Sequence, residues 1–322
     1  MKESNYITFL TLRLFMALLP LILGWPLLAF CLCVYNLVMI TSTRGGVYGG
    51  IVSAATAFAG AMLCYVCGLG MAYGGFFALQ IVLASSFCSL TVITRKGFAA
   101  GLLAASVGYG LGNVLNLKHL ADSAGLSIAD YMYSAVEPIV SQSINSAFGG
   151  NTPFPDGIPG FDADNMITLI SDAIKSLIPG VIIIGAIIAG YGAMWMISRN
   201  LRGTHLDNRH SFSNIRINPA SLCFGAAMLI LLFVPGNMVN IVGLNGLIVF
   251  LFLAFCGGLS LADFLLRQKI ERPLPRILIH IAIIIGGSVV SAFFPLVNIY
   301  LLYALMGIID AFVSIRKRVT QQ

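Results

Sequence analysis

The residues of this chain that could most readily do chemistry are its cysteines. Among the seven cysteines, Cys64 and Cys67 form a CxxC pair, and Cys31 and Cys33 lie two positions apart. Paired thiols could pass electrons to a quinone, as in a thiol oxidoreductase. However, residues two positions apart do not face the same side of a helix, and neither pair has the basic neighbours that would favour a thiolate. We therefore expect the cysteines to be small apolar packing residues.

Motifs of other enzymes are absent from the sequence. The chain contains no HExxH, GxSxG or P-loop segment. The stretch GLSLA around Ser260 lacks the second glycine of a nucleophile elbow. We therefore expect no catalytic residues, no cofactor and no metal site, and we do not expect this protein to be an enzyme.

Two amides lie in the segment NVLN, where Asn113 and Asn116 follow the glycine pair Gly108 and Gly112. Three further glycine pairs have the same four-residue spacing: Gly45 and Gly49, Gly46 and Gly50, and Gly70 and Gly74. Such glycines let helix backbones approach closely in lipid, so packing within the chain is one interpretation. The other is that Asn113 and Asn116 bind a substrate in a cavity, because an unsatisfied amide is costly in hydrocarbon.

Charged groups occur near the ends of two apolar segments. Asp263 is followed four positions later by Arg267, and Asp310 precedes the basic group at 316–318. Carboxylates at such depth need partners, so we expect ion pairs, with Asp263 and Arg267 on one helix face. A proton site or a docking point for a cytoplasmic partner is the alternative. His280 is expected to be a packed polar side chain.

The elements that must position these residues are membrane helices. The 322 residues are 58% hydrophobic and 9% charged, with a mean hydropathy of +0.94. Because a membrane helix needs about 20 apolar residues, we predict an all-α, polytopic transmembrane bundle of about ten spans. The apolar tracts run over 7–24, 26–41, 47–68, 72–93, 97–116, 179–198, 219–235, 239–266, 277–293 and 296–314.

Basic residues determine the predicted orientation of these spans. They fall into groups two spans apart: Lys2, Arg44, Arg95 with Lys96, 199–216, 267–276 and 316–318. The positive-inside rule then puts both termini in the cytoplasm. Residues 7–41 could form one long tilted helix, but this orientation of Lys2 and Arg44 requires two crossings, with a turn at LGWPLL and with Arg13 reaching the inner interface. The basic residues that give the net charge of +6 therefore indicate how the spans are oriented. They do not indicate a nucleic-acid partner.

Residues 117–178 form the long external segment of this topology, between an N-terminal bundle at 1–116 and a C-terminal bundle at 179–322. The segment holds seven of the twelve acidic residues. Apolar residues recur at helical spacing on both sides of the Pro/Gly/Asp stretch 148–165, which predicts two amphipathic helices joined by a hinge, with a bend or restart at Pro138. We expect this segment to be either a lid over an external cavity or a passive surface cap.

Four segments resemble the YybS-like family of bacterial membrane proteins, which is catalogued as a domain of unknown function. They are FSNIRINP (212–219), FCGGLSLADFLLR (255–267), YALMGIIDAFVSIRKR (303–318) and RGGVYGGIVSAA (44–55). The resemblance implies a multi-pass protein of the bacterial cytoplasmic (inner) membrane. More distantly, the chain is similar to the substrate-binding components of energy-coupling-factor transporters. Those components usually have six spans and work with separate coupling subunits.

The sequence thus predicts an integral membrane protein that binds or transports a small solute, with membrane lipids as its surroundings. The alternative is a non-transporting scaffold or regulatory protein. In that case Arg202, Arg209 and Arg216 would recruit a cytoplasmic partner, because they lie in a basic segment predicted to be cytoplasmic.

Overall fold

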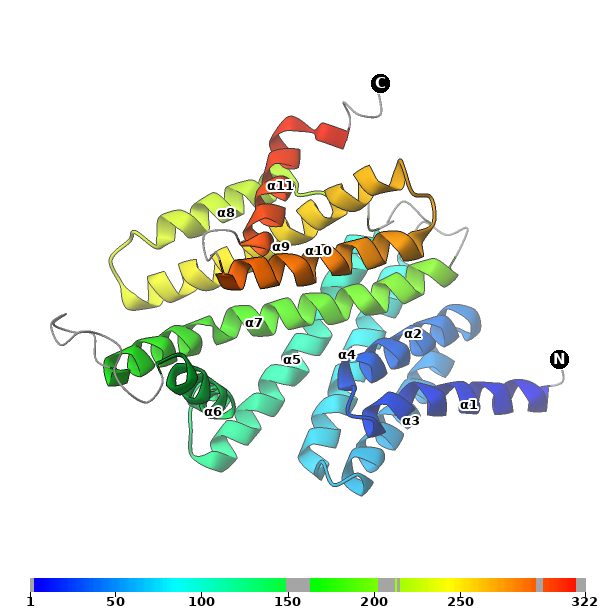
Figure 1. Ribbon diagram of the computed structural model, residues 1–322. Coiled ribbons are helices and arrows are strands. Elements are labelled where there is room, and N and C mark those ends of the chain that lie inside the picture. The colour runs from blue at the N-terminus through cyan, green and yellow to red at the C-terminus, as the bar shows by residue number, and fades with distance from the viewer. Residues whose placement is uncertain (1–2, 149–162, 202–211, 213–214, 294–297, 317–322) are drawn as a thin grey trace, which may run out of the picture. The chain divides into compact units, whose positions relative to one another are not determined.

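The computed structural model describes residues 3–148, 163–201, 212, 215–293 and 298–316, and every regular element in these ranges is a helix (Figure 1). The first six helices are α1 (Glu3–Ile22), α2 (Pro26–Arg44), α3 (Gly46–Val66), α4 (Met71–Ile93), α5 (Phe98–Ala124) and α6 (Ile128–Phe148). The remaining five are α7 (Ala163–Asn200), α8 (Pro219–Leu231), α9 (Asn237–Arg267), α10 (Pro273–Phe293) and α11 (Ile299–Val313). The all-α prediction is confirmed.

Most of these helices have the length and composition of membrane spans. Within the described ranges, 7 helical segments qualify: Pro26–Arg44, Gly46–Val66, Met71–Ile93, Phe98–Ala124, Ile170–Asn200, Asn237–Arg267 and Pro273–Val290. Three shorter apolar helices, Leu12–Ile22, Pro219–Leu231 and Ile299–Val313, occupy the other positions at which the sequence predicts spans. The polytopic architecture follows, since so much apolar surface requires a lipid environment.

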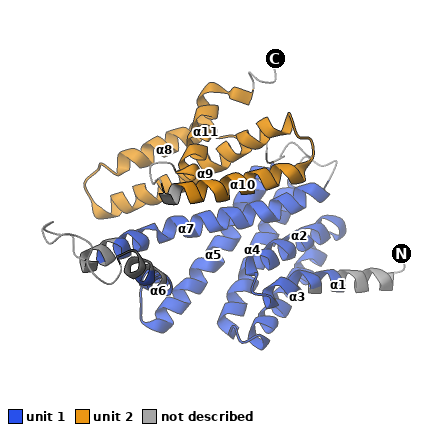
Figure 2. Cartoon of the chain, viewed as in Figure 1, with its two compact units in different colours: residues 1–207 blue, residues 208–322 orange. Residues whose placement is uncertain are grey.

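The chain forms two compact units, residues 1–207 and 208–322, which Figure 2 shows in blue and orange. This division differs from the three segments, 1–116, 117–178 and 179–322, that the sequence indicated. The reason is that α7 is one continuous helix through Pro179, and it packs on α2 and α5 of the first unit. The sequence analysis assigned the span at 179–198 to the C-terminal bundle. That span is part of α7, which belongs to the 1–207 unit.

The first two helices form a hairpin rather than one long tilted helix. The chain turns between Ile22 and Pro26 through Gly24, whose φ of +75° is favourable only for glycine. Pro26 then occupies the first turn of α2, where its missing N–H costs nothing. Arg13 of α1 donates a hydrogen bond to the Tyr35 hydroxyl of α2 at 2.6 Å. The turn predicted at LGWPLL is confirmed, and Arg13 has a partner on the neighbouring helix.

Glycines set the helix spacing of the 1–207 unit. A Cβ on Gly108 of α5 would lie 2.6 Å from the backbone nitrogen of Ala84 in α4. A Cβ on Gly74 of α4 would lie 2.6 Å from the carbonyl oxygen of Ala61 in α3. These backbones therefore touch directly, as expected for glycine-mediated packing in lipid. The core of this unit includes Phe30 and Leu37 of α2, Ile81 of α4, and Met194 and Ile197 of α7, each almost fully buried.

In the 208–322 unit, α9 packs against both α8 and α11. Two glycines make the α9–α11 contact possible. A Cβ on Gly258 would overlap the carbonyl group of Tyr303, and one on Gly307 would overlap that of Ala254. The two helices therefore cross at backbone contact.

The amphipathic helix α6 is held against α7 by polar contacts. Ser127 caps α6 by accepting a hydrogen bond from the Asp130 backbone N–H at 3.1 Å. The Asp130 carboxylate pairs with Lys175 of α7 at 2.7 Å, and the Lys175 ammonium also lies 5.2 Å from the centre of the Tyr133 ring. The helix continues through Pro138, where the sequence suggested a bend or restart. Most of the predicted hinge at 148–165 lies outside the described residues.

The Asp130–Lys175 pair predicts a pH dependence for the docking of α6. The hydrogen bond from Lys175, followed by that from Ser127, lowers the pKa of the Asp130 carboxyl. The stabilising contribution is therefore complete above the ordinary carboxyl pKa of about 4 and is lost as the pH falls through the lowered value. Spin labels at the exposed positions Ser134 and Ala173 should report a longer α6–α7 distance in acid.

The matched variant is Asp130→Asn, which cannot form the ion pair. Its label distance should be long and should not change when the pH is lowered from 7. A wild-type distance that is equally insensitive to acid would show that the ion pair does not hold α6 in place.

Candidate functional site

The described residues of the 1–207 unit contain a small polar cavity, which we name the amide pocket. Its polar wall consists of Tyr73 and Gln80 from α4 and Tyr109, Asn113 and Asn116 from α5. Its volume is about 40 Å³. The structure therefore brings together the two asparagines that the sequence singled out, and it adds a third amide, Gln80.

Helical spacing and a glycine contact build this pocket. Residues 109, 113 and 116 are four and three positions apart, so they share one face of α5. Gly112 lies on the same helix, and a Cβ there would overlap the Gln80 side chain. Because Gly112 has no Cβ, the Gln80 side chain fits beside Asn113 and Asn116.

The amides are buried in an apolar bundle without full hydrogen bonding. Asn116 is 8% exposed and Gln80 is 6% exposed. Among the described residues, the Oδ1 atom of Asn116 has no hydrogen-bond partner. A buried unpaired amide oxygen costs about 1–3 kcal/mol, so the pocket favours an occupant that donates a hydrogen bond. No charged side chain lines it, which favours a neutral occupant.

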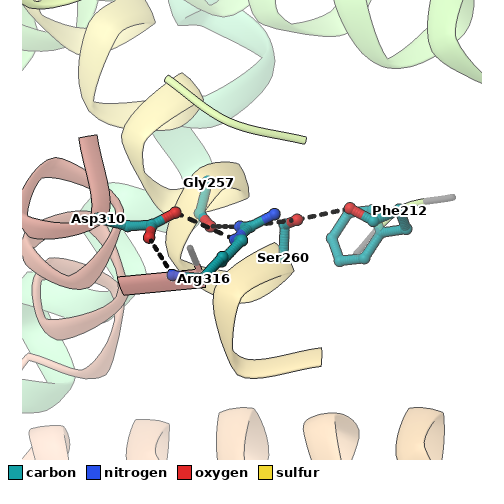
Figure 3. Close-up of polar contacts among 5 residues, drawn as sticks. All are labelled: Phe212, Gly257, Ser260, Asp310 and Arg316. Atoms are coloured by element: carbon teal, nitrogen blue, oxygen red, sulfur yellow. Dashed lines mark hydrogen bonds and ion pairs between the residues drawn. The ribbon is translucent and has the colours of Figure 1, made fainter. Parts of the chain in front are cut away.

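A second polar cluster lies in the 208–322 unit and is centred on Arg316 (Figure 3). Ser314 has a φ of +51°, and the chain beyond it brings Arg316 against α9. The Arg316 side chain is 1% exposed, and its Nε lies 3.0 Å from the Asp310 Oδ2. One Nη donates to the Ser260 hydroxyl at 3.1 Å and to the Gly257 carbonyl at 3.3 Å. Ser260 in turn donates to the Phe212 carbonyl at 2.5 Å.

Within this cluster the Arg316 charge faces the Asp310 carboxylate and has a second basic neighbour in Arg216. Burial lowers the pKa of the Arg316 guanidinium, and the neighbouring Asp310 charge acts in the opposite direction. The expected pairing of Asp310 with the basic group at 316–318 is confirmed. The cluster ties the end of the described chain to α9, which is a structural role.

Asp263 has a different partner from the one expected. Arg267 is exposed and forms no ion pair with it within the described chain. Instead, the Asp263 Oδ1 lies 3.4 Å from the Arg276 Nε and 3.7 Å from the His280 Nε2, both on α10. The Asp263–Arg267 prediction is thus corrected, because Asp263 lies on a buried face of α9 that meets α10. His280 is 9% exposed, as expected for a packed histidine.

The arginines and cysteines singled out in the sequence do not form a further site among the described residues. Arg202 and Arg209 lie outside the described residues, and Arg216 is exposed. All seven cysteines are free, with Cys64 buried and Cys67 exposed. Within the described ranges, no three His, Cys, Asp or Glu side chains are grouped so that they could hold a metal ion.

Sequence reasoning missed Gln80 and the two tyrosines of the amide pocket. A signal for Gln80 was present, since it is the one amide in the apolar run FFALQIVLA, and a polar side chain within a span marks a functional candidate. The tyrosines carried no comparable signal, because aromatic residues are common throughout the chain.

Comparison with known proteins gives one match. A family model described as "Predicted membrane protein (DUF2232)" covers residues 11–311. No curated protein matches the chain, and no solved structure does.

Proposed function

The chain belongs to the predicted membrane protein family DUF2232, and from this premise we propose that it binds a small neutral solute and carries it across the membrane. The observation that carries the proposal is the amide pocket. Three amides and two phenols converge there inside an apolar bundle, and the Oδ1 of Asn116 has no partner among the described residues. Polar side chains within spans are costly and commonly serve function.

The size of the pocket restricts its occupant. A cavity of about 40 Å³ holds a few atoms, whereas pockets for drug-sized ligands are roughly 300–1,000 Å³. The solute is therefore small, or the surrounding helices separate to admit it. Movement of α4 relative to α5 would enlarge the pocket, since its polar groups come from these two helices.

The number of helices in the 1–207 unit supports the resemblance to substrate-binding components of energy-coupling-factor transporters. That unit contains α1 to α5 and α7 as apolar helices, together with the amphipathic α6. Six apolar helices is the usual number in such components, although the whole chain has more. On this proposal the protein is a YybS-like protein of the bacterial inner membrane, and separate subunits supply any ATP coupling.

The first test is mass spectrometry of small molecules that co-purify with the protein in mild detergent. We expect a near-stoichiometric neutral metabolite with the wild type. Asn116→Leu should lose it, because a leucine removes the amide and fills the pocket. Asn200→Leu makes the same change at an exposed amide at the end of α7 and should retain it.

A variant lacking residues 149–164 tests whether the external segment is a lid, in which case the metabolite is also lost. Only lipids in every sample, unchanged by Asn116→Leu, would contradict solute binding. That result would favour the scaffold function, which predicts that a cytoplasmic partner is lost when Arg202, Arg209 and Arg216 are neutralised.

A further inference from the structure

The 1–207 unit has a second cavity, whose mainly apolar wall carries several hydroxyl groups and which we name the hydroxyl groove. Its hydroxyl groups come from Thr41 of α2, Ser53 of α3 and Ser85, Ser86 and Ser89 of α4. Its volume is about 220 Å³. The groove lies at the end of the unit where α2 turns into α3.

Within the described residues, hydrogen bonding leaves two of these hydroxyls, those of Ser86 and Ser89, available. Ser53 and Ser85 bond to each other at 3.2 Å, and Thr41 donates to the Leu37 carbonyl at 2.8 Å. Ser89 is 7% exposed, lines the groove, and makes no hydrogen bond to another described residue. A hydroxyl of a buried residue that lines a cavity and has no hydrogen bond favours a ligand with hydrogen-bonding groups.

The groove also depends on a glycine. A Cβ on Gly49 would overlap the Thr41 hydroxyl. The close approach of α3 to the end of α2 at this point therefore requires glycine. It brings the Thr41 hydroxyl to the wall of the groove.

The hydroxyl groove shares one chemical property with the amide pocket, which is an uncharged lining. Neither cavity has a charged side chain in its lining. Hydroxyls and amides both donate and accept hydrogen bonds. A charged ligand would find no counter-ion among the residues that line either cavity. Both cavities thus select neutral solutes that carry hydroxyl or amide groups.

Helix α4 joins the two cavities. Gln80 lines the amide pocket and Ser85 lines the hydroxyl groove, and five residues of helix span about 7.5 Å. Between them, Ile81 and Ala84 are fully buried, and Gly108 of α5 packs on Ala84 at backbone contact. A short, closely packed barrier therefore separates the two cavities.

We infer that the hydroxyl groove is the second binding site of one solute path, which runs along α4 and carries neutral polyols or amides. This inference rests on the proposed function and adds the substrate class and the other end of the path. Arg44, Arg95 and Lys96 lie at the groove end of the helices, so the positive-inside rule predicts that this end is cytoplasmic.

The test uses Ser89→Cys, a small change whose thiol can be blocked after the protein has folded. The exposed Cys67 and Cys223 are first replaced by serine, and the protein is reconstituted into proteoliposomes. Swelling in glycerol and in ribitol is followed by light scattering before and after treatment with a methanethiosulfonate reagent. We expect the reagent to slow swelling at least about tenfold, as loss of a required hydrogen-bonding site would.

Ala54→Cys is the matched control, because Ala54 is exposed on α3 and does not line the groove. Its modification should leave swelling unchanged.

If modified Ser89→Cys protein still swells at the original rate, the groove is not on the path. The proposed function then survives only if a solute still co-purifies and is lost in Asn116→Leu. Proteoliposomes that never swell in either polyol would overturn the substrate class. Cross-linking of Ser89→Cys to a second membrane helix would make the groove a packing surface and overturn the inference.

Discussion

Replacing Arg316 by methionine should lower the stability of the 208–322 unit by about 3–5 kcal/mol, because removing one partner of a buried ion pair leaves an uncompensated charge. The Asp310 carboxylate is 5% exposed and would lose the guanidinium 3.0 Å away. The Ser260 hydroxyl and the Gly257 carbonyl would lose their donor as well. Thermal unfolding in detergent, followed by size-exclusion chromatography of heated samples, measures the change.

Two further variants show whether the loss of stability arises from the uncompensated charge of Asp310. Asp310→Asn combined with Arg316→Met removes both charges and should be more stable than Arg316→Met alone. Lys118→Met breaks an exposed pair with Asp122 and should change stability by about 1 kcal/mol or less. If Arg316→Met and Lys118→Met had the same Tm as the wild type, the buried ion pair would not stabilise this unit.

Alanine at Gly258 or Gly307 should also lower the stability of the 208–322 unit. The added methyl group would overlap a backbone carbonyl of the facing helix at either position, so α9 and α11 must separate. Overpacking commonly costs about 1–3 kcal/mol, and here the obstructing atoms belong to backbone rather than to a movable side chain. The loss should appear as a lower Tm in the heating assay and as faster proteolysis of the 208–322 unit.

Gly286→Ala provides the comparison in the same unit. Gly286 lies within α10, and a Cβ there would meet no atom within 4 Å. Its replacement should be neutral or should stabilise by about 0.5–1 kcal/mol, since glycine within a helix is unfavourable relative to alanine. Equal effects of Gly286→Ala and Gly258→Ala would mean that the α9–α11 crossing is not limited by backbone contact.

Much of the architecture followed from the sequence because membrane spans are defined by long apolar runs. The turn at Gly24 and the Asp310–Arg316 pair followed as well, since both depend on residues close together in the chain. The Asp263–Arg276 contact did not follow, because it joins two helices. In lipid, a helix can be apolar all round, so periodicity does not indicate which face turns inward. For the same reason the sequence could propose Asn113 and Asn116 but could not place Gln80 beside them.

The continuity of α7 has a mechanical consequence. Its 38 residues extend about 57 Å, nearly twice the roughly 30 Å of a bilayer's hydrocarbon core. One part of the rod packs on α2 and α5, and the part carrying Lys175 holds α6. Because Lys175 belongs to the same helix that packs on α2 and α5, the Asp130–Lys175 contact connects the amphipathic helix α6 directly to the core of the bundle.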